Sequence, residues 1–171
     1  MEATSLPETL NSFSHDQFIQ TFGGIFEHSP WIAEKALSKK PFKTVNDAFE
    51  VMKEIVEEAS YNQQLALIKE HPELGKRIKM SKASVREQSG AGLDNLSPEE
   101  FEVFSTLNQS YMEKFNFPFI IAVAGKDKSD ILVAMKERLN NTREVEFETA
   151  LDEIYKIAKI RFNAIIESLT N

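Results

Sequence analysis

Apolar residues recur at helical spacing along nearly the whole chain, and this periodicity limits what the chain can fold into. The clearest case is the segment 44–60, in which seven apolar residues fall on one helical face. They are Val45, Ala48, Phe49, Met52, Ile55, Val56 and Ala59. The opposite face is charged, which is typical of a helix that covers a core. The pattern therefore predicts an all-α fold, a helical bundle of about seven to nine helices.

The same spacing, together with helix-start and helix-stop signals, predicts the other helices. Their expected ranges are about 14–22, 30–37, a segment that ends at residue 71, 97–116, 129–139 and 144–169. Ser97, Pro98 and Glu100 stand in the order of a helix start, with Ser97 as the cap and Glu100 reaching back. No repeat or low-complexity tract divides the chain. We therefore expect one domain over residues 1–171.

The segment 117–125 departs from the helical pattern. It reads Phe-Pro-Phe-Ile-Ile-Ala-Val-Ala-Gly, an apolar run whose periodicity fits a buried strand or a short buried helix equally well. A lone strand would leave its backbone groups without hydrogen bonds, and no other segment looks like its partner. We expect a buried turn or the start of a helix, with some backbone groups left for a ligand. Such a lining suits a small heterocycle.

The composition excludes several classes of protein. With 27 acidic and 20 basic residues the net charge is -7, which argues against a nucleic-acid-binding surface. The absence of cysteine excludes disulfides, thiolate zinc sites and cysteine nucleophiles. No apolar run approaches the ~20 residues of a membrane span, and the first ten residues do not resemble a signal peptide. We therefore expect a cytoplasmic protein that binds any anionic ligand through a local basic site.

Three histidines are candidates for chemistry, and their wide spacing gives no metal-binding motif. His15 and His28 lie in polar contexts typical of surface residues. His71 precedes Pro72, whose ring disfavours helical geometry at the residue before it, so a helix should end at His71. The negative end of the helix dipole favours an imidazolium there, which is useful for a proton donor. Position alone, however, favours a histidine that only stabilises the helix end.

The polar segment 84–88 is a second candidate. At helical spacing Ser84, Glu87 and Gln88 share one face, while Val85 and Arg86 lie between them. Two glycines soon afterwards would end the helix and permit a close approach to the backbone. The alternative is a solvated helix with an ordinary glycine stop.

Arg161 is the third candidate, because it falls within the apolar stripe of the last expected helix. The stripe consists of Phe147, Ala150, Leu151, Ile154, Ile157, Ala158, Ala164 and Ile165. A guanidinium keeps its charge, so it must reach solvent, pair with a buried carboxylate or bind an anionic ligand. Its fork suits a carboxylate. A structural ion pair and a substrate clamp explain the position equally well.

Several motifs follow one another along the chain. They are His71-Pro72-Glu73-Leu74-Gly75, Ser84-x-x-Glu87-Gln88 with Gly90-Ala91-Gly92-Leu93, Leu107-Asn108-x-x-Tyr111-x-x-Lys114-Phe115, Phe117-Pro118-Phe119-Ile120, and Glu148-x-x-Leu151-x-Glu153-Ile154 with Arg161. Together they resemble the 2-oxo-4-hydroxy-4-carboxy-5-ureidoimidazoline (OHCU) decarboxylases. The resemblance covers nearly the whole chain, from Phe22-Gly23-Gly24 and His28-Ser29-Pro30-Trp31 onward.

The resemblance implies an all-helical enzyme of purine breakdown that acts after urate oxidation and hydroxyisourate hydrolysis and releases carbon dioxide to give (S)-allantoin. By matching position, His71 is expected to be the general acid, Glu87 its electrostatic and orienting partner, and Arg161 a substrate-binding or catalytic cation. The expected substrate-binding residues are Pro72, Ser84, Val85, Arg86, Glu87, Gln88, Phe119, Ile120, Ile121, Ala122 and Val123.

The resemblance implies neither a cofactor nor a metal. The expected partners are the small anionic substrate and a second copy in a homodimer, and neither nucleic acid nor a membrane is expected. Fusion to, or cooperation with, urate oxidase and hydroxyisourate hydrolase is a further expectation. The first motif departs from the form His-Pro-Asp-Leu-Ala-Gly, because it has Glu73 and lacks the alanine. This departure concerns the shape of the loop and not His71.

Two rival interpretations remain. In a non-catalytic helical interaction module, the same residues would form a buried polar network and the acidic surface would recruit a protein partner. A hydrolase would also use a histidine and a carboxylate, but it would form no carbon dioxide. An open cleft where His71, Glu87 and Arg161 converge favours catalysis, whereas a dry, fully paired network favours the interaction module.

Overall fold

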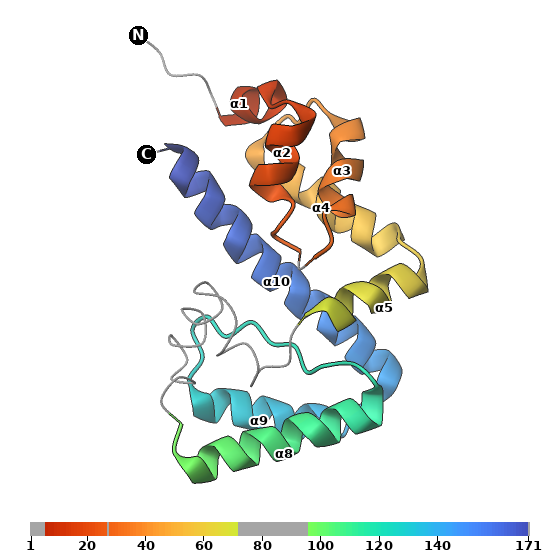
Figure 1. The fold of residues 1–171 in the computed structure, drawn as a ribbon, viewed down its shortest axis with the longest axis vertical. Helices are drawn as coiled ribbons and strands as arrows, with labels where there is room; N and C mark the ends of the chain where they lie inside the picture. Colours follow the sequence, from red (N-terminus) through yellow and green to blue (C-terminus); the bar gives the residue numbers. More distant parts are fainter. Residues whose placement is uncertain (1–5, 27, 72–95, 171) are drawn as a thin grey trace. The chain divides into compact units, whose positions relative to one another are not determined.

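The computed structural model describes residues 6–26, 28–71 and 96–170, and in these ranges the chain is built from helices (Figure 1). The helices are α1 (Leu6–Ser12), α2 (His15–Phe22), α3 (Trp31–Ala36) with the 3₁₀ turn η1 (Leu37–Lys39), α4 (Val45–Glu58), α5 (Tyr61–Glu70), α8 (Pro98–Phe115), α9 (Lys128–Arg138) and α10 (Arg143–Thr170). No strand occurs within the described ranges. The predicted all-α class is confirmed.

Five of the described helices begin with a capping box, in which the cap side chain and a side chain three residues later bond reciprocally to backbone N–H groups. The caps are Ser14, Thr44, Ser60, Ser97 and Asp127. At α8 the Ser97 hydroxyl accepts from the Glu100 N–H at 3.1 Å, and Glu100 accepts from the Ser97 N–H at 2.9 Å. The helix start predicted at Ser97 is therefore confirmed.

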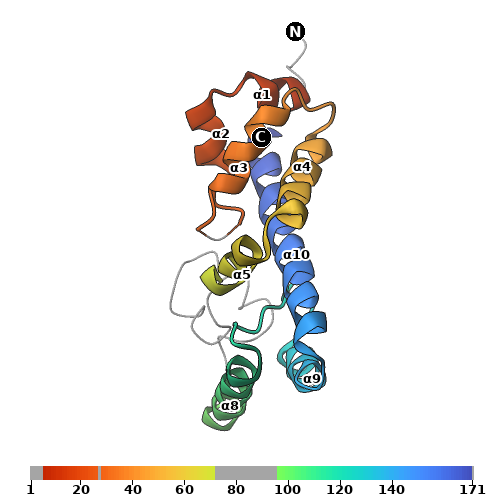
Figure 2. The same ribbon diagram turned by 90° about the vertical axis from the view of Figure 1, so that its right-hand side faces the viewer.

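The chain forms two compact units, and the first consists of Met1–Leu67 with Tyr155–Asn171. Within it α3 packs against α2 and α4, and Figure 2 shows these three helices together. Buried phenylalanines form much of its core, with Phe162 of α10 lying 5.3 Å from Phe22 and 5.6 Å from Phe49 between ring centroids. Phe18 stacks on Phe42 at 5.9 Å. Aromatic packing thus joins the C-terminal half of α10 to the N-terminal helices of this unit.

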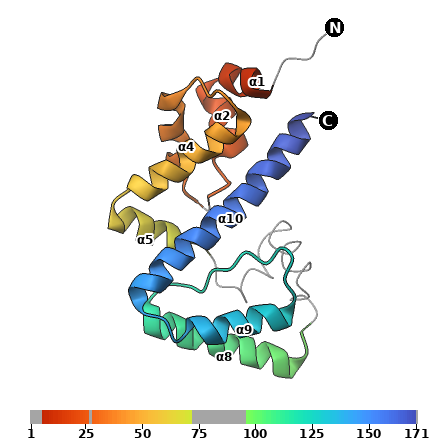
Figure 3. The same ribbon diagram turned by 180° about the vertical axis from the view of Figure 1, so that it is seen from behind.

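The second unit is Ile68–Ile154, and it contains α8, α9 and the N-terminal half of α10. Figure 3 shows α8 and α9 running beside each other, in agreement with their packing. Tyr111 of α8 contacts Phe115 at 4.6 Å and Phe119 at 5.2 Å between ring centroids. Phe117 meets Phe147 of α10 edge to face at 6.2 Å. The core of this unit is therefore centred on the aromatic end of α8 and the segment that follows it.

The segment after α8 is buried without being helical. Residues 117–123 are all buried, and residues 118–123 have no regular secondary structure. The segment ends in a turn at Gly125, whose φ of +76° is a conformation that glycine adopts readily, and Asp127 then caps α9. The expected burial is confirmed, but the expected form, a buried turn or the start of a helix, is wrong: the buried residues 118–123 have irregular backbone, and the turn at residues 124–125 is exposed. Residues 119–123, which the sequence analysis expected to bind substrate, are called the pocket segment below.

The stripe predicted for the last helix is correct over most of its length and wrong at its end. Phe147, Ala150, Leu151, Ile154, Ile157 and Ala158 are buried, whereas Ala164 is exposed and Ile165 is only half-buried. The periodicity identifies the face that packs, but the packing partners of that face end before residue 164. Within the described ranges, no helix combines the length and the hydropathy needed to cross a membrane.

Candidate active site

His71 lies where the sequence predicts it, immediately after the last residue of α5. Its backbone N–H donates to the Ile68 carbonyl at 3.2 Å, and the residue is only 2% exposed. A histidine that merely stabilised a surface helix end would remain largely in water. The burial of His71 therefore favours a role inside the protein over that of a solvent-exposed helix end.

The other predicted residues are distributed between the two units. The pocket segment shares the second unit with His71, whereas Arg161 belongs to the first unit and is half-buried on α10. Pro72, Ser84, Val85, Arg86, Glu87 and Gln88 lie outside the described residues. The convergence of His71, Glu87 and Arg161 stays a prediction.

Two charged side chains hold the backbone of the pocket segment. The Ile120 carbonyl accepts a hydrogen bond from Nη1 of Arg138 at 2.7 Å. The Ala122 N–H donates to Oε1 of Glu153 at 3.1 Å. Arg138 is the last residue of α9 and Glu153 lies on α10, so two different helices fix this non-helical backbone.

The Ile121 backbone behaves differently from its neighbours. Among the residues that the structure describes, neither its N–H nor its carbonyl has a hydrogen-bond partner. In an extended chain the groups of successive residues point to opposite sides, which fits the partners found at Ile120 and Ala122. The Ile121 side of the pocket segment therefore offers one donor and one acceptor in an apolar setting, as the sequence analysis expected of this region.

A buried polar network surrounds Arg138, and the sequence analysis did not identify it. Nε of Arg138 lies 2.8 Å from Oε1 of Glu146, which is fully buried. The Tyr111 hydroxyl donates to the same carboxylate at 2.5 Å, and Nδ2 of Asn141 donates to its other oxygen at 2.8 Å. Burial, followed by the hydrogen bond to Glu146, raises the pKa of Tyr111 well above its ordinary value. The phenol is therefore held neutral beside the ion pair.

A sequence signal for Glu146 and Glu153 was present. Glu146, Ala150, Glu153 and Ile157 are spaced at i, i+4, i+7 and i+11, which places them on one helical face. Two acidic residues on the buried face of a helix need partners, as Arg161 was recognised to need one. The positions of Glu146 and Glu153 on this face therefore indicate a buried network.

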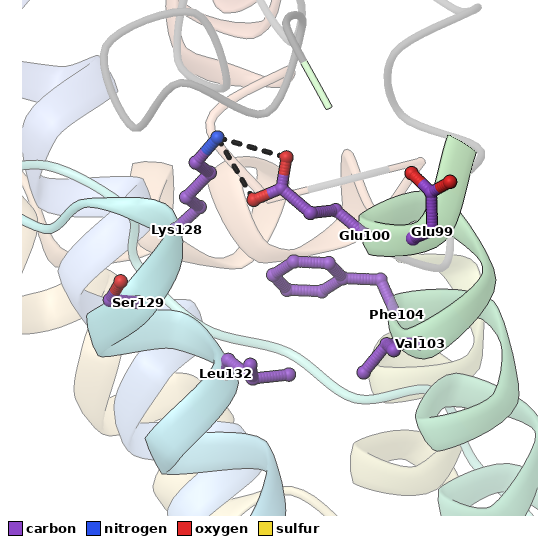
Figure 4. A pocket seen from close by; sticks show the side chains of 7 residues that line it. All are labelled: Glu99, Glu100, Val103, Phe104, Lys128, Ser129 and Leu132. Carbon is purple, nitrogen blue, oxygen red and sulfur yellow. Dashed lines mark hydrogen bonds and ion pairs between the residues drawn. The ribbon is translucent and has the colours of Figure 1, made fainter. Parts of the chain in front are cut away.

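A small pocket of about 180 Å³ lies elsewhere, between the first turns of α8 and α9 (Figure 4). Nζ of Lys128 bonds both oxygens of Glu100, at 2.9 and 3.0 Å. The backbone hydrogen bond from Ser97, followed by the bond from Lys128, lowers the pKa of Glu100. Mainly apolar atoms of residues such as Val103, Phe104 and Leu132 line the remainder. No predicted site residue lines this pocket, so it is not the candidate active site.

In the described part of the chain, no three histidine, aspartate or glutamate side chains lie close enough together to hold a metal ion. The polar groups of this region are instead the buried imidazole of His71 and the backbone groups of Ile121. Such groups suit proton transfer and hydrogen bonding to a small polar ligand.

Comparison with known sequences gives a consistent result. The profile of the OHCU decarboxylase family matches residues 11–163. A 2-oxo-4-hydroxy-4-carboxy-5-ureidoimidazoline decarboxylase of Haloferax volcanii is 44% identical, over 90% of this chain and 92% of that protein. A uric acid degradation bifunctional protein of Bacillus subtilis is 47% identical over 93% of this chain, which spans 32% of that longer protein.

Solved structures agree with the sequence comparison. A crystal structure of (S)-allantoin synthase is similar with a TM-score of 0.78 at 30% identity, covering 94% of this chain and 54% of that chain. A crystal structure of an OHCU decarboxylase in the presence of (S)-allantoin gives a TM-score of 0.69 at 25% identity, covering 91% of this chain and 99% of that chain. The likeness therefore extends over nearly the whole chain.

Proposed function

This chain belongs to the OHCU decarboxylase family, and we propose that it converts 2-oxo-4-hydroxy-4-carboxy-5-ureidoimidazoline to (S)-allantoin with release of carbon dioxide. The observation that carries the proposal is the family match over residues 11–163, with a decarboxylase relative that this chain spans almost end to end. The substrate is a small anionic molecule, and the reaction belongs to urate degradation.

The chemistry defines what the site must supply. Breaking the bond to the carboxylate leaves an electron pair on a ring carbon, and a proton must then reach one face of that carbon. We propose His71 as the general acid. Its imidazole is buried, and it belongs to the same unit as the pocket segment. Glu87 would keep the imidazole charged and oriented. General acid catalysis of this kind contributes roughly 10²–10⁴-fold in rate.

Backbone groups of the pocket segment complete the recognition of substrate. The Ile121 N–H would donate to a carbonyl of the substrate, and the Ile121 carbonyl would accept from one of its N–H groups. A urea or a cyclic amide carries both kinds of group next to each other, so one residue can bind both. Apolar neighbours exclude water and strengthen these hydrogen bonds.

Arg161 is proposed to bind the carboxylate of the substrate. Its guanidinium is half-buried and permanently charged, and its planar fork matches a carboxylate. An acidic protein with a net charge of -7 needs such a local cation for an anionic substrate. The substrate-binding role of residues 84–88 and Pro72 rests on the resemblance of their motifs.

Cooperation with other enzymes of urate degradation is also proposed. The Bacillus subtilis relative is named as a bifunctional uric acid degradation protein, in which the similar region is one part of a longer chain. We expect this chain to work with urate oxidase and hydroxyisourate hydrolase, to form a homodimer and to be cytoplasmic. Sedimentation equilibrium at micromolar concentration tests the dimer, which requires twice the monomer mass of 19.5 kDa.

The decisive experiment follows allantoin formation by circular dichroism, with substrate generated in situ by urate oxidase and hydroxyisourate hydrolase. The wild-type protein is expected to form (S)-allantoin faster than the spontaneous reaction forms the racemate. His71→Asn is expected to lose this rate at least about 100-fold while remaining folded. His15→Asn is the matched control, because His15 is an exposed histidine, and it should retain full activity.

Two outcomes contradict the proposal in different ways. A wild-type protein no faster than the background excludes the decarboxylase and favours the interaction module. An active, folded His71→Asn variant keeps the decarboxylase but removes the general-acid role from His71.

A further inference from the structure

We propose that Glu153 and Arg138 are positioning residues of the active site, which hold the Ala122 N–H and the Ile120 carbonyl so that the Ile121 backbone faces the substrate. The inference rests on the proposed function, since it concerns how that site is kept in shape. Neither residue is among those that the sequence analysis assigned to catalysis or to substrate binding. Each acts through the backbone of the pocket segment.

Glu153 holds one side of Ile121. Its Oε1 lies 3.1 Å from the Ala122 nitrogen, and the residue is 6% exposed on the packed face of α10. Hydrogen bonds that involve an ionised group are stronger and more directional than neutral ones. A buried carboxylate on a helix is therefore a fixed acceptor for a backbone amide that no helix or sheet satisfies.

Arg138 holds the other side. Its Nη1 donates to the Ile120 carbonyl at 2.7 Å, and its guanidinium carbon lies 4.4 Å from the ring centroid of Phe119. The Nε of the same group bonds Glu146 at 2.8 Å, which prevents the guanidinium from turning away. The planar group is thus fixed in three directions, by a carbonyl, a carboxylate and an aromatic ring.

The two hydrogen bonds together orient the residue between them. Ile120 and Ala122 are two residues apart, and in an extended chain such residues direct their backbone groups to the same side. Both groups bond to charged side chains of α9 and α10, and with this alternation the groups of Ile121 are directed to the opposite side. No donor or acceptor in the described parts of the chain takes up the Ile121 groups. The positions of two charged anchors thereby set the direction of a substrate-binding amide and carbonyl.

A buried charge has a cost that a purely packed loop would avoid. An apolar residue at position 153 would leave the Ala122 amide without its acceptor, and the pocket segment would shift to find another. A displacement of about 1 Å in a binding group is enough to reduce catalysis by large factors. The charged anchors are therefore expected to matter for binding of substrate and not only for folding.

The test compares Glu153→Leu with Glu153→Gln in the complete protein. The leucine variant removes the acceptor, and it is expected to raise KM about 10-fold and to weaken binding of (S)-allantoin by a similar factor in titration calorimetry. The glutamine variant keeps an amide oxygen that can accept from the Ala122 N–H, so KM and allantoin affinity should stay within about threefold of wild type. Rescue by glutamine separates a hydrogen-bonding role from a loss of general stability.

Ile131→Val is the matched control, because Ile131 is buried on α9 and its side chain has no part in the hydrogen bonds of the pocket segment. It should lower Tm but leave KM unchanged. Arg138→Lys keeps the buried charge, tests the hydrogen bond to the Ile120 carbonyl and should also raise KM. If Glu153→Leu does not fold, this variant tests the proposal by itself.

The outcomes are distinguishable. If the wild-type protein forms no (S)-allantoin, both the proposed function and this inference are wrong. Active wild type with unchanged KM and allantoin affinity in a folded Glu153→Leu or Arg138→Lys variant overturns the positioning role alone. An equal rise in KM for Ile131→Val also overturns it, because the effect would then follow from destabilisation.

Discussion

Nε of Arg138, the last residue of α9, lies 2.8 Å from Oε1 of Glu146 in the first turn of α10, and both side chains are buried. The pair connects the ends of two consecutive helices, and through Nη1 of Arg138 it also holds the Ile120 carbonyl. The geometry of the pocket segment and the stability of the second unit therefore depend on the same two side chains.

Arg138→Met is expected to lower the free energy of unfolding by about 3–5 kcal/mol, because it leaves Glu146 as a buried charge without its cation. The double variant Arg138→Met with Glu146→Leu should lose much less than the sum of the two single changes. Urea unfolding measures all three. The half-exposed ion pair of Lys128 and Glu100 provides the control, since Lys128→Met should cost at most about 1 kcal/mol. A loss of that size for Arg138→Met would contradict the importance of the buried pair.

Tyr111→Phe is expected to change how stability depends on pH. Because the pKa of Tyr111 is raised in the folded protein, the phenol's contribution is fully present below about pH 10 and is lost as the pH rises above that value. Above pH 10 the free energy of unfolding should fall about 1.4 kcal/mol per pH unit faster in wild type than in the variant. Urea unfolding between pH 8 and about pH 11 tests this difference. Parallel curves would show that Tyr111 does not titrate differently on unfolding.

Asn108→Leu is expected to leave the free energy of unfolding unchanged or to raise it by up to about 1 kcal/mol. The residue is 7% exposed, and within the described part of the protein its Oδ1 is buried without a hydrogen-bond donor. Asn141→Leu is the contrasting variant, because Nδ2 of Asn141 donates to Glu146 at 2.8 Å, and it should cost about 1–3 kcal/mol. Chemical denaturation compares the two. A large loss for Asn108→Leu would mean that its amide is satisfied in solution.

Arg161→Met tests the proposed carboxylate clamp. Loss of a charge-assisted pair of hydrogen bonds should raise KM by about 10–100-fold in the coupled allantoin assay, with the helical circular dichroism spectrum retained. Lys156→Met removes one positive charge from an exposed position of the same helix and should change KM less than about twofold. Equal effects of the two variants would assign Arg161 to general electrostatics and not to a specific contact.

Periodicity and capping chemistry predicted most of the helices. Among the described helices the exception is α1, whose seven residues span only two turns, so that too few apolar positions recur to establish a period. Ala164 and Ile165 show another limit. A stripe of apolar residues identifies the inner face of a helix, but the length of that face that is covered depends on other elements.

The candidate site was predictable in part. The proline after His71 predicted the end of α5, and the apolar run after α8 predicted a buried segment. Its irregular backbone was not predicted, because a turn or the start of a helix was expected there. Arg138 and Glu153 were not predicted, because their partners in the pocket segment lie 18 and 31 residues away in the sequence. A single sequence shows that a buried charge needs a partner, but it does not show which backbone group that partner is.

The first unit is discontinuous, since Met1–Leu67 is completed only by Tyr155–Asn171. Phe22 and Phe49 both pack on Phe162, which leaves the ribosome after every residue of the second unit has been made. During synthesis, part of the aromatic core of the N-terminal helices therefore stays uncovered until Phe162 has been made. The whole sequence of the second unit is made before that. The last helix is thus the element whose synthesis completes the N-terminal core, and until then the nascent chain exposes apolar surface of the kind that promotes aggregation.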